Sequence, residues 1–143
     1  MNLIRAGLLS TALLAVAAPV QADALKQQVD AWRGAHEAQI LTQFDQLLRF
    51  PSVAADPKGV TDAAAWLEQQ LKARGFQTEL LSVPNSLPVV YGFLATPGAT
   101  RTVVFYAHYD GQPVTPSQWA TPPFEPTMRS APLADGGQVV DWK

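Results

Sequence analysis

Apolar residues recur at steps of three and four along the stretch from Asp23 to Phe50, and polar residues fill most positions between them. This spacing predicts a long amphipathic helix. Pro51 is expected to end the helix, because proline lacks an amide donor and disfavours helical geometry in the residue before it. Gly34 is expected to weaken the helix in its middle. The apolar positions of the pattern are Leu25, Val29, Trp32, Ile40, Phe44, Leu47 and Leu48.

A second helix is predicted from Thr61 to about Arg74. Thr61 follows a stretch of turn composition and is the expected N-cap, and Asp62 has the charge that the start of a helix favours. Gly75 is expected to end the helix in the left-handed conformation. The apolar face is formed by Ala63, Leu67 and Leu71.

Three strand-like runs follow Gly75, and turn-forming residues separate them. We expect the first two, at 76–83 and 89–95, to pair as a hairpin. The third, at 101–107, is apolar on both faces, as in a central strand that helices cover. Two helices followed by these strands predict an α/β sandwich, in which ligands bind beyond the carboxyl ends of the strands.

The chain after the third predicted strand is rich in proline, which indicates an ordered but irregular loop. Trp119 and Phe124 are expected to anchor this loop. A hairpin is predicted within 133–143, with its turn at 135–137 and its returning strand at 139–140.

Residues 1–22 have the pattern of a secretory signal peptide, with Arg5 near the start, an apolar core and small residues at the end. Cleavage is expected after Ala22, which would export the protein to the periplasm or the extracellular space. The apolar core is short for a permanent membrane helix, and an uncleaved anchor is the competing interpretation.

Composition excludes several kinds of site and partner. The chain contains no cysteine, so it has no disulfide, thiolate metal site, cysteine nucleophile or lipid-modified cysteine. Any metal must be held by histidine, aspartate and glutamate. The formal net charge is −2, and lysine and arginine are scattered singly. A nucleic-acid partner is therefore not expected.

His108 and Asp110 directly follow the third apolar run. Side chains alternate along a strand, so the two should lie on one face, about 7 Å apart along the chain. Imidazole is a good zinc ligand, and a nearby carboxylate fixes its tautomer and raises its basicity. A histidine at a strand end is also often a purely structural, hydrogen-bonded residue, and the pair alone leaves both interpretations open.

A longer motif surrounds this pair. The run from His108 to Val114, followed by Trp119 and by the run Pro123–Pro126, resembles the signature of the zinc exopeptidases and amidohydrolases of peptidase family M-20. This family includes carboxypeptidase G, aminoacylase and carnosine-type dipeptidases. The segment from Arg49 to Val53 resembles the loop after the family's first helix. The resemblance covers the chain from the first helix to Arg129.

The resemblance implies that this chain is the amino-terminal portion of a three-layer α/β catalytic domain, at 23–143. It implies that His108 is a zinc ligand and that Asp110 is the catalytic carboxylate orienting it. Two zinc ions, with cobalt or manganese as alternatives, would activate water to hydrolyse a small peptide or an acylated amino acid. The family's bridging aspartate and glutamate base are not found, and Asp135 and Asp141 are interpreted as surface turn residues. This chain alone is then expected to be inactive.

Two other functional interpretations remain. One is a non-catalytic exported α/β module or gene relic with at most weak binding of a single metal, because one histidine and one carboxylate make a poor zinc site. The other is a hydrolase that is complete in this length and uses Asp110, although no nucleophile and base are visible. His36 is interpreted as a helix residue without a chemical role, and Trp32 and Trp66 as core residues. The oligomeric state is left open.

Overall fold

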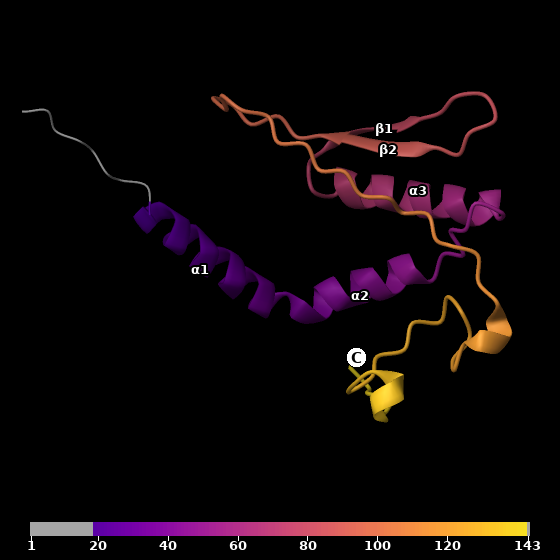
Figure 1. The fold of residues 1–143 in the computed structure, drawn as a ribbon. Helices are drawn as coiled ribbons and strands as arrows, with labels where there is room; N and C mark the ends of the chain where they lie inside the picture. Colours follow the sequence, from indigo (N-terminus) through magenta and orange to yellow (C-terminus); the bar gives the residue numbers. More distant parts are fainter. Residues whose placement is uncertain (1–18, 143) are drawn as a thin grey trace, which may run out of the picture. The chain divides into compact units, whose positions relative to one another are not determined.

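The computed structural model describes residues 19–142. It is a small mixed α/β structure with three helices and one two-stranded sheet (Figure 1). The chain divides into two compact units, of which the first ends at Glu37 and the second begins at Ala38, and each is described by itself. The elements are α1 (Pro19–Ala35), α2 (Glu37–Leu48), α3 (Pro57–Lys72), β1 (Gln77–Leu81) and β2 (Val89–Phe93), with short 3-10 turns at Pro116–Gln118 and Leu133–Asp135.

The single long helix predicted for 23–50 is wrong, because the structure contains two helices that are interrupted at His36. The backbone amide of His36 is shared between the carbonyl oxygens of Trp32 and Arg33, at 3.1 Å from each. Its ring Nδ1 also lies 2.7 Å from the Trp32 carbonyl oxygen, and the ring stacks on the Trp32 indole with centroids 4.2 Å apart. Local bonding by the His36 side chain thus competes with the regular helical pattern.

Trp32 was expected in the core, but its side chain is 57% exposed. Most of the predicted signal peptide, at 1–18, lies outside the described residues. Among the helices that the structure describes, none has the length and apolar character needed to cross a membrane.

The N-cap of α3 lies five residues before the predicted one. Asp56 is the N-cap, and its Oδ1 accepts a hydrogen bond of 3.0 Å from the backbone amide of Gly59. Pro57 occupies the first helical position, where its missing amide and fixed φ are favourable. Thr61 instead lies within the helix, and its hydroxyl donates to the Pro57 carbonyl oxygen. Asp56 and Pro57 are therefore the start signal that the choice of Thr61 overlooked.

The predicted end of α3 is confirmed. Gly75 adopts φ = +84°, and its amide donates to the Lys72 carbonyl oxygen at 2.9 Å. The amide of Phe76 donates to the Leu71 carbonyl oxygen at 3.1 Å. These two bonds form a Schellman motif, which satisfies carbonyl groups that the helix end would leave without partners.

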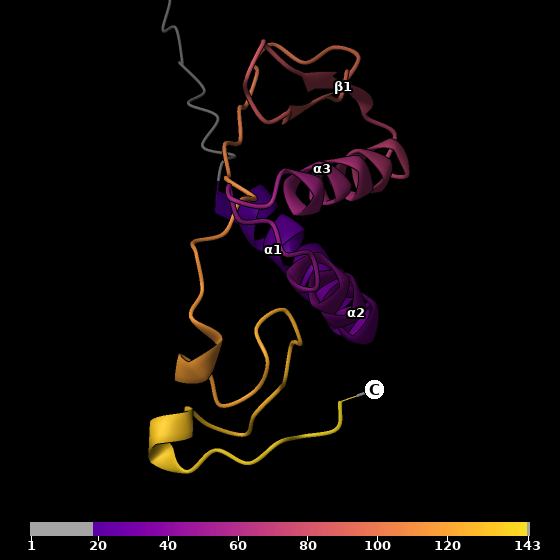
Figure 2. The same ribbon diagram turned by 90° about the vertical axis from the view of Figure 1, so that its right-hand side faces the viewer.

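β1 and β2 form the predicted antiparallel hairpin, which packs on α3 (Figures 1 and 2). Thr78 and Leu80 alternate with exposed residues along β1, as expected for a sheet with one covered face. The Thr78 hydroxyl also donates to Glu68 of α3 at 3.1 Å. Gly92 of β2 lets the Leu71 side chain approach closely, since a Cβ at that position would lie 3.0 Å from it. The fully buried apolar side chains of the described residues are Val60, Ala63 and Ala64, all on α3.

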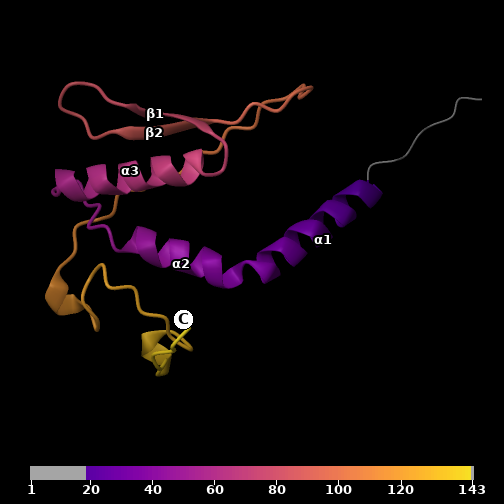
Figure 3. The same ribbon diagram turned by 180° about the vertical axis from the view of Figure 1, so that it is seen from behind.

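The third predicted strand, at 101–107, is wrong. The structure has no strand there, and Figure 3 draws this stretch as a thin coil. The side chains from Val103 to Tyr106 are 72–93% exposed. A central strand requires a neighbour that bonds to its backbone, and no described residue provides one for this stretch.

The hairpin predicted near the carboxyl end is confirmed in part. Val139 returns as expected, but it pairs with Arg129, and the amide of Val140 donates to the Met128 carbonyl oxygen at 3.0 Å. The segment that it pairs with therefore precedes residue 133. A 3-10 turn and Gly136, at φ = +76°, make the connection.

Candidate functional site

His108 and Asp110 lie together although the predicted strand before them is absent. Nδ1 of His108 is 3.3 Å from Oδ1 of Asp110 and 3.0 Å from the backbone carbonyl oxygen of Asp110. Both of these oxygens are acceptors, so a neutral His108 ring carries its proton on Nδ1 and keeps the lone pair on Nε2. The two side chains are 75% and 51% exposed. The pair therefore presents an accessible imidazole nitrogen of defined tautomer.

Two contacts anchor the segment that carries the pair. The amide of Gly111 donates to the Ser52 carbonyl oxygen at 2.7 Å, and Gly111 forms a parallel bridge with Val53. Tyr109 is half-buried and its hydroxyl donates to the Pro88 carbonyl oxygen. Burial, together with the nearby Asp110 charge, raises the pKa of the Tyr109 phenol. The expectation that Tyr109 packs is thus confirmed, and the segments at 49–53 and 108–114 lie side by side.

A pocket of about 460 Å³ opens next to the pair. This volume is within the range of small-molecule sites. Its wall is mainly apolar and combines the end of α2 with the proline-rich loop. Trp119 lines it but is 54% exposed, so this residue does not anchor the loop as expected. The lining residues include Leu47, Phe50, His108, Asp110, Val114, Trp119 and Phe124.

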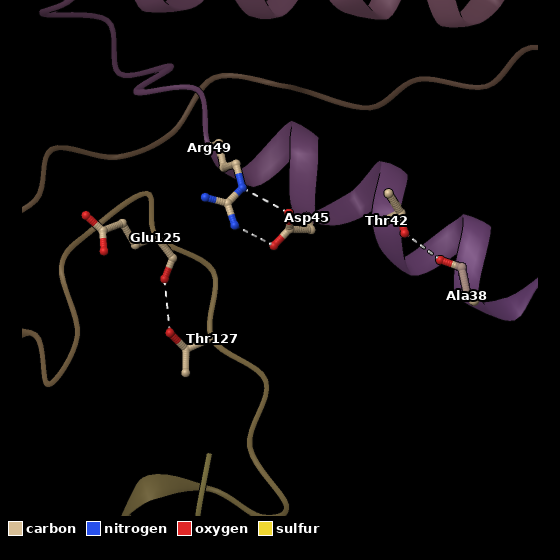
Figure 4. A network of polar contacts seen from close by, with 6 residues as sticks. All are labelled: Ala38, Thr42, Asp45, Arg49, Glu125 and Thr127. Atoms are coloured by element: carbon tan, nitrogen blue, oxygen red, sulfur yellow. Dashed lines mark hydrogen bonds and ion pairs between the residues drawn. The ribbon is translucent and has the colours of Figure 1, made fainter. Parts of the chain in front are cut away.

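An ion pair lies at the end of α2, next to the residues that line the pocket. Arg49 binds Asp45 through two hydrogen bonds of 2.9 and 3.0 Å, from Nε and Nη2 (Figure 4). Asp45 is 8% exposed, and its carboxylate raises the pKa of Arg49, as does the charge of Glu125 to a smaller extent. The sequence prediction missed Asp45, although its spacing of four residues from Arg49 is the signal of such a pair on a helix.

The described residues do not provide a complete metal site. Nowhere among them do three or more histidine, aspartate and glutamate side chains come together so that they could hold a metal. Zinc sites use at least three protein ligands, so His108 with Asp110 is at most part of one. His36 lies in the break between α1 and α2, and Asp135 and Asp141 are exposed. Neither of the two aspartates extends the pair.

No protein-family model matches the chain, and no solved structure matches it.

Proposed function

We propose that this chain is the amino-terminal part of an exported zinc-dependent peptidase or amidase, similar to peptidase family M-20. In this proposal, its three helices and hairpin belong to a larger three-layer α/β domain. His108 would be one zinc ligand through Nε2, and Asp110 holds the ring by accepting a hydrogen bond from Nδ1–H. The substrate is a small peptide or an acylated amino acid. The remaining ligands and the general base come from residues outside the described group.

The observation that carries the proposal is the paired geometry of His108 and Asp110 at the edge of a pocket. The pocket adds support because both segments with the family's motifs line it, through Phe50 and Ser52 on one side and Gly111 on the other. Within this chain, the residues of the site position the imidazole and the substrate but do not complete the metal site. Asp110 fixes the tautomer, the Gly111 amide positions the turn, and the apolar wall offers a surface for a substrate side chain.

The first experiment measures the intact mass and the zinc content of the exported gene product, isolated with an antibody against the segment at 23–50. The proposal predicts a product longer than 143 residues that carries two zinc ions and loses hydrolytic activity in His108→Ala. A metal-free product of at most 143 residues would refute it.

A second experiment tests His108 in the 143-residue chain alone. The chain has two histidines, so His36→Ala is a matched control for His108→Ala. In an NMR titration with zinc, the Nε2 signal of His108 is expected to shift with weak affinity, and Asp110→Asn should weaken this response further. Equal responses of His36 and His108 would contradict the special role of the pair.

A second candidate function is a non-catalytic exported module that binds a single metal weakly, since one histidine and one carboxylate make a poor zinc site. The intact-mass experiment separates the two, since the module is predicted to be a short product without bound zinc.

A further inference from the structure

Asp110, which holds the imidazole of the candidate site, lies between two residues that are bonded to distant parts of the chain. On one side, the Tyr109 hydroxyl donates to the Pro88 carbonyl oxygen. On the other side, the Gly111 amide donates to the Ser52 carbonyl oxygen at 2.7 Å. Pro88 directly precedes β2, and Ser52 lies in the connection between α2 and α3. The two bonds therefore hold Asp110 from two separate parts of the fold.

The stretch before the site provides no such restraint. None of the described backbone groups at 101–107 forms a hydrogen bond with another part of the chain. In a sheet, the bonds between strands would fix the backbone up to the end of the strand. Here the half-buried Tyr109 side chain takes that place, whereas the Tyr106 side chain is 93% exposed.

We propose that Tyr109 is a positioning residue for the His108 imidazole and that it acts through Asp110. Nδ1 of His108 lies 3.3 Å from Oδ1 of Asp110 and 3.0 Å from its backbone carbonyl oxygen. Both oxygens face the ring only while the backbone at 108–110 keeps its conformation. By fixing its phenol at Pro88, Tyr109 restrains that conformation and so keeps the ring in one orientation.

The restraint is formed entirely by described residues of this chain. Val89, which follows Pro88, pairs with Leu81 in the β1–β2 hairpin, and the hairpin packs on α3. The Pro88 carbonyl oxygen is therefore held by the hairpin. The use of an oriented imidazole as a zinc ligand rests on the proposed function, but the orientation itself does not require zinc.

The order of the His108 ring tests the restraint without any metal. Tyr109→Phe removes the hydroxyl and keeps the aromatic ring, and Tyr106→Phe is the matched control. In carbon-13 NMR relaxation of the 143-residue chain, the order parameter of the His108 ring is expected to fall in Tyr109→Phe, from about 0.85 towards about 0.6. It should stay unchanged in Tyr106→Phe. An equal ring order in Tyr109→Phe and the parent would overturn the proposal.

A double-mutant cycle separates positioning from a general effect on stability. The zinc response of His108 is measured by NMR in the parent, Tyr109→Phe, Asp110→Ala and the double variant. Tyr109→Phe is expected to raise the zinc dissociation constant by up to about tenfold, the factor that corresponds to one hydrogen bond. In the Asp110→Ala background the same change should have a much smaller effect, because the residue through which Tyr109 acts is altered. Equal effects in both backgrounds would overturn the proposal.

A further measurement needs no variant. Protons of the Tyr109 ring should show a nuclear Overhauser contact with the Pro88 α-proton in the parent chain, and its absence would overturn the proposal even if Tyr109→Phe failed to fold. The ring-order result also stands apart from zinc chemistry. If His108 shows no zinc response but its ring order falls as expected in Tyr109→Phe, the role of His108 in the proposed function is refuted and the positioning role of Tyr109 is supported.

Discussion

Gly59 is a position where the structure reverses the usual effect of a glycine substitution. It lies in the first turn of α3, where Ala would normally be favoured over Gly by up to about 1 kcal/mol. A Cβ at Gly59, however, would lie 2.2 Å from the Pro51 carbonyl oxygen and 2.8 Å from its carbon. The nearer contact is about 0.8 Å shorter than the 3.0 Å that real Cβ atoms keep. These are backbone atoms, which cannot rotate away.

Gly59→Ala must therefore displace the Pro51 backbone or the start of α3. Overpacking of this kind costs about 1–3 kcal/mol, and the gain in helix propensity offsets part of it. We expect the free energy of unfolding to fall by about 1–2 kcal/mol. With a urea m-value of about 1 kcal/mol/M, the unfolding midpoint followed by circular dichroism falls by about 1 M or more.

Gly34→Ala is the matched control, because a Cβ at Gly34 in α1 would meet nothing within 4 Å. This variant should gain helical signal, in keeping with a propensity gain of up to about 1 kcal/mol. A displaced Pro51 also moves Ser52, whose carbonyl oxygen holds the Gly111 amide. The NMR signals of His108 should therefore shift in Gly59→Ala but not in Gly34→Ala. A Gly59→Ala chain as stable as the parent would refute the close approach of Pro51 to α3.

Two further predictions concern single hydrogen bonds. Asp56→Ala removes the cap of α3 and should lower the free energy of unfolding by about 1 kcal/mol. Asp56→Asn should retain most of the parent's stability, because asparagine is also a good N-cap. Equal urea midpoints for Asp56→Ala and the parent would contradict the capping role of Asp56. The pKa of the Tyr109 phenol is raised in the folded chain, so folding favours the neutral form of this side chain. The stabilisation that results is fully present below the unfolded phenol pKa of about 10, and it is lost as the pH rises through the folded pKa. An alkaline absorbance titration should contain this late ionisation, and Tyr109→Phe should lack it; an unchanged titration would contradict the raised pKa.

Structural elements that are specified by a few neighbouring residues could be predicted from the sequence. The end of α3 at Gly75 follows from one glycine that reaches the left-handed conformation without a steric cost. The β1–β2 hairpin follows from two adjacent runs of strand-forming residues, and the observed strands differ from the predicted ones by at most two residues at each end. The N-cap of α3 was mispredicted, although the Asp56–Pro57 signal was present in the chain.

The proximity of His108 and Asp110 also followed from the sequence, because the two residues are separated by one position. Other features of the candidate site depend on contacts between distant residues. The bond from Gly111 to Ser52 joins residues far apart in the sequence, and so does the bond from Tyr109 to Pro88. No periodicity or motif specifies such partners, and only the resemblance suggested that the two segments belong together.

The stretch at 101–107 shows most clearly that a local preference for strand does not by itself produce a strand in the folded structure. Its composition favours a strand, and that preference is a property of the residues themselves. A strand also needs a second backbone to accept and donate its hydrogen bonds, and the identity of that backbone is not encoded in the run. Helix starts and ends, the hairpin turn and the tautomer of His108 depend on neighbours in the chain. Whether the third run finds a pairing partner, how closely Pro51 approaches Gly59 and which residues form the walls of the pocket depend on which distant segments meet. The folded structure alone shows that the third run has no partner among the described residues.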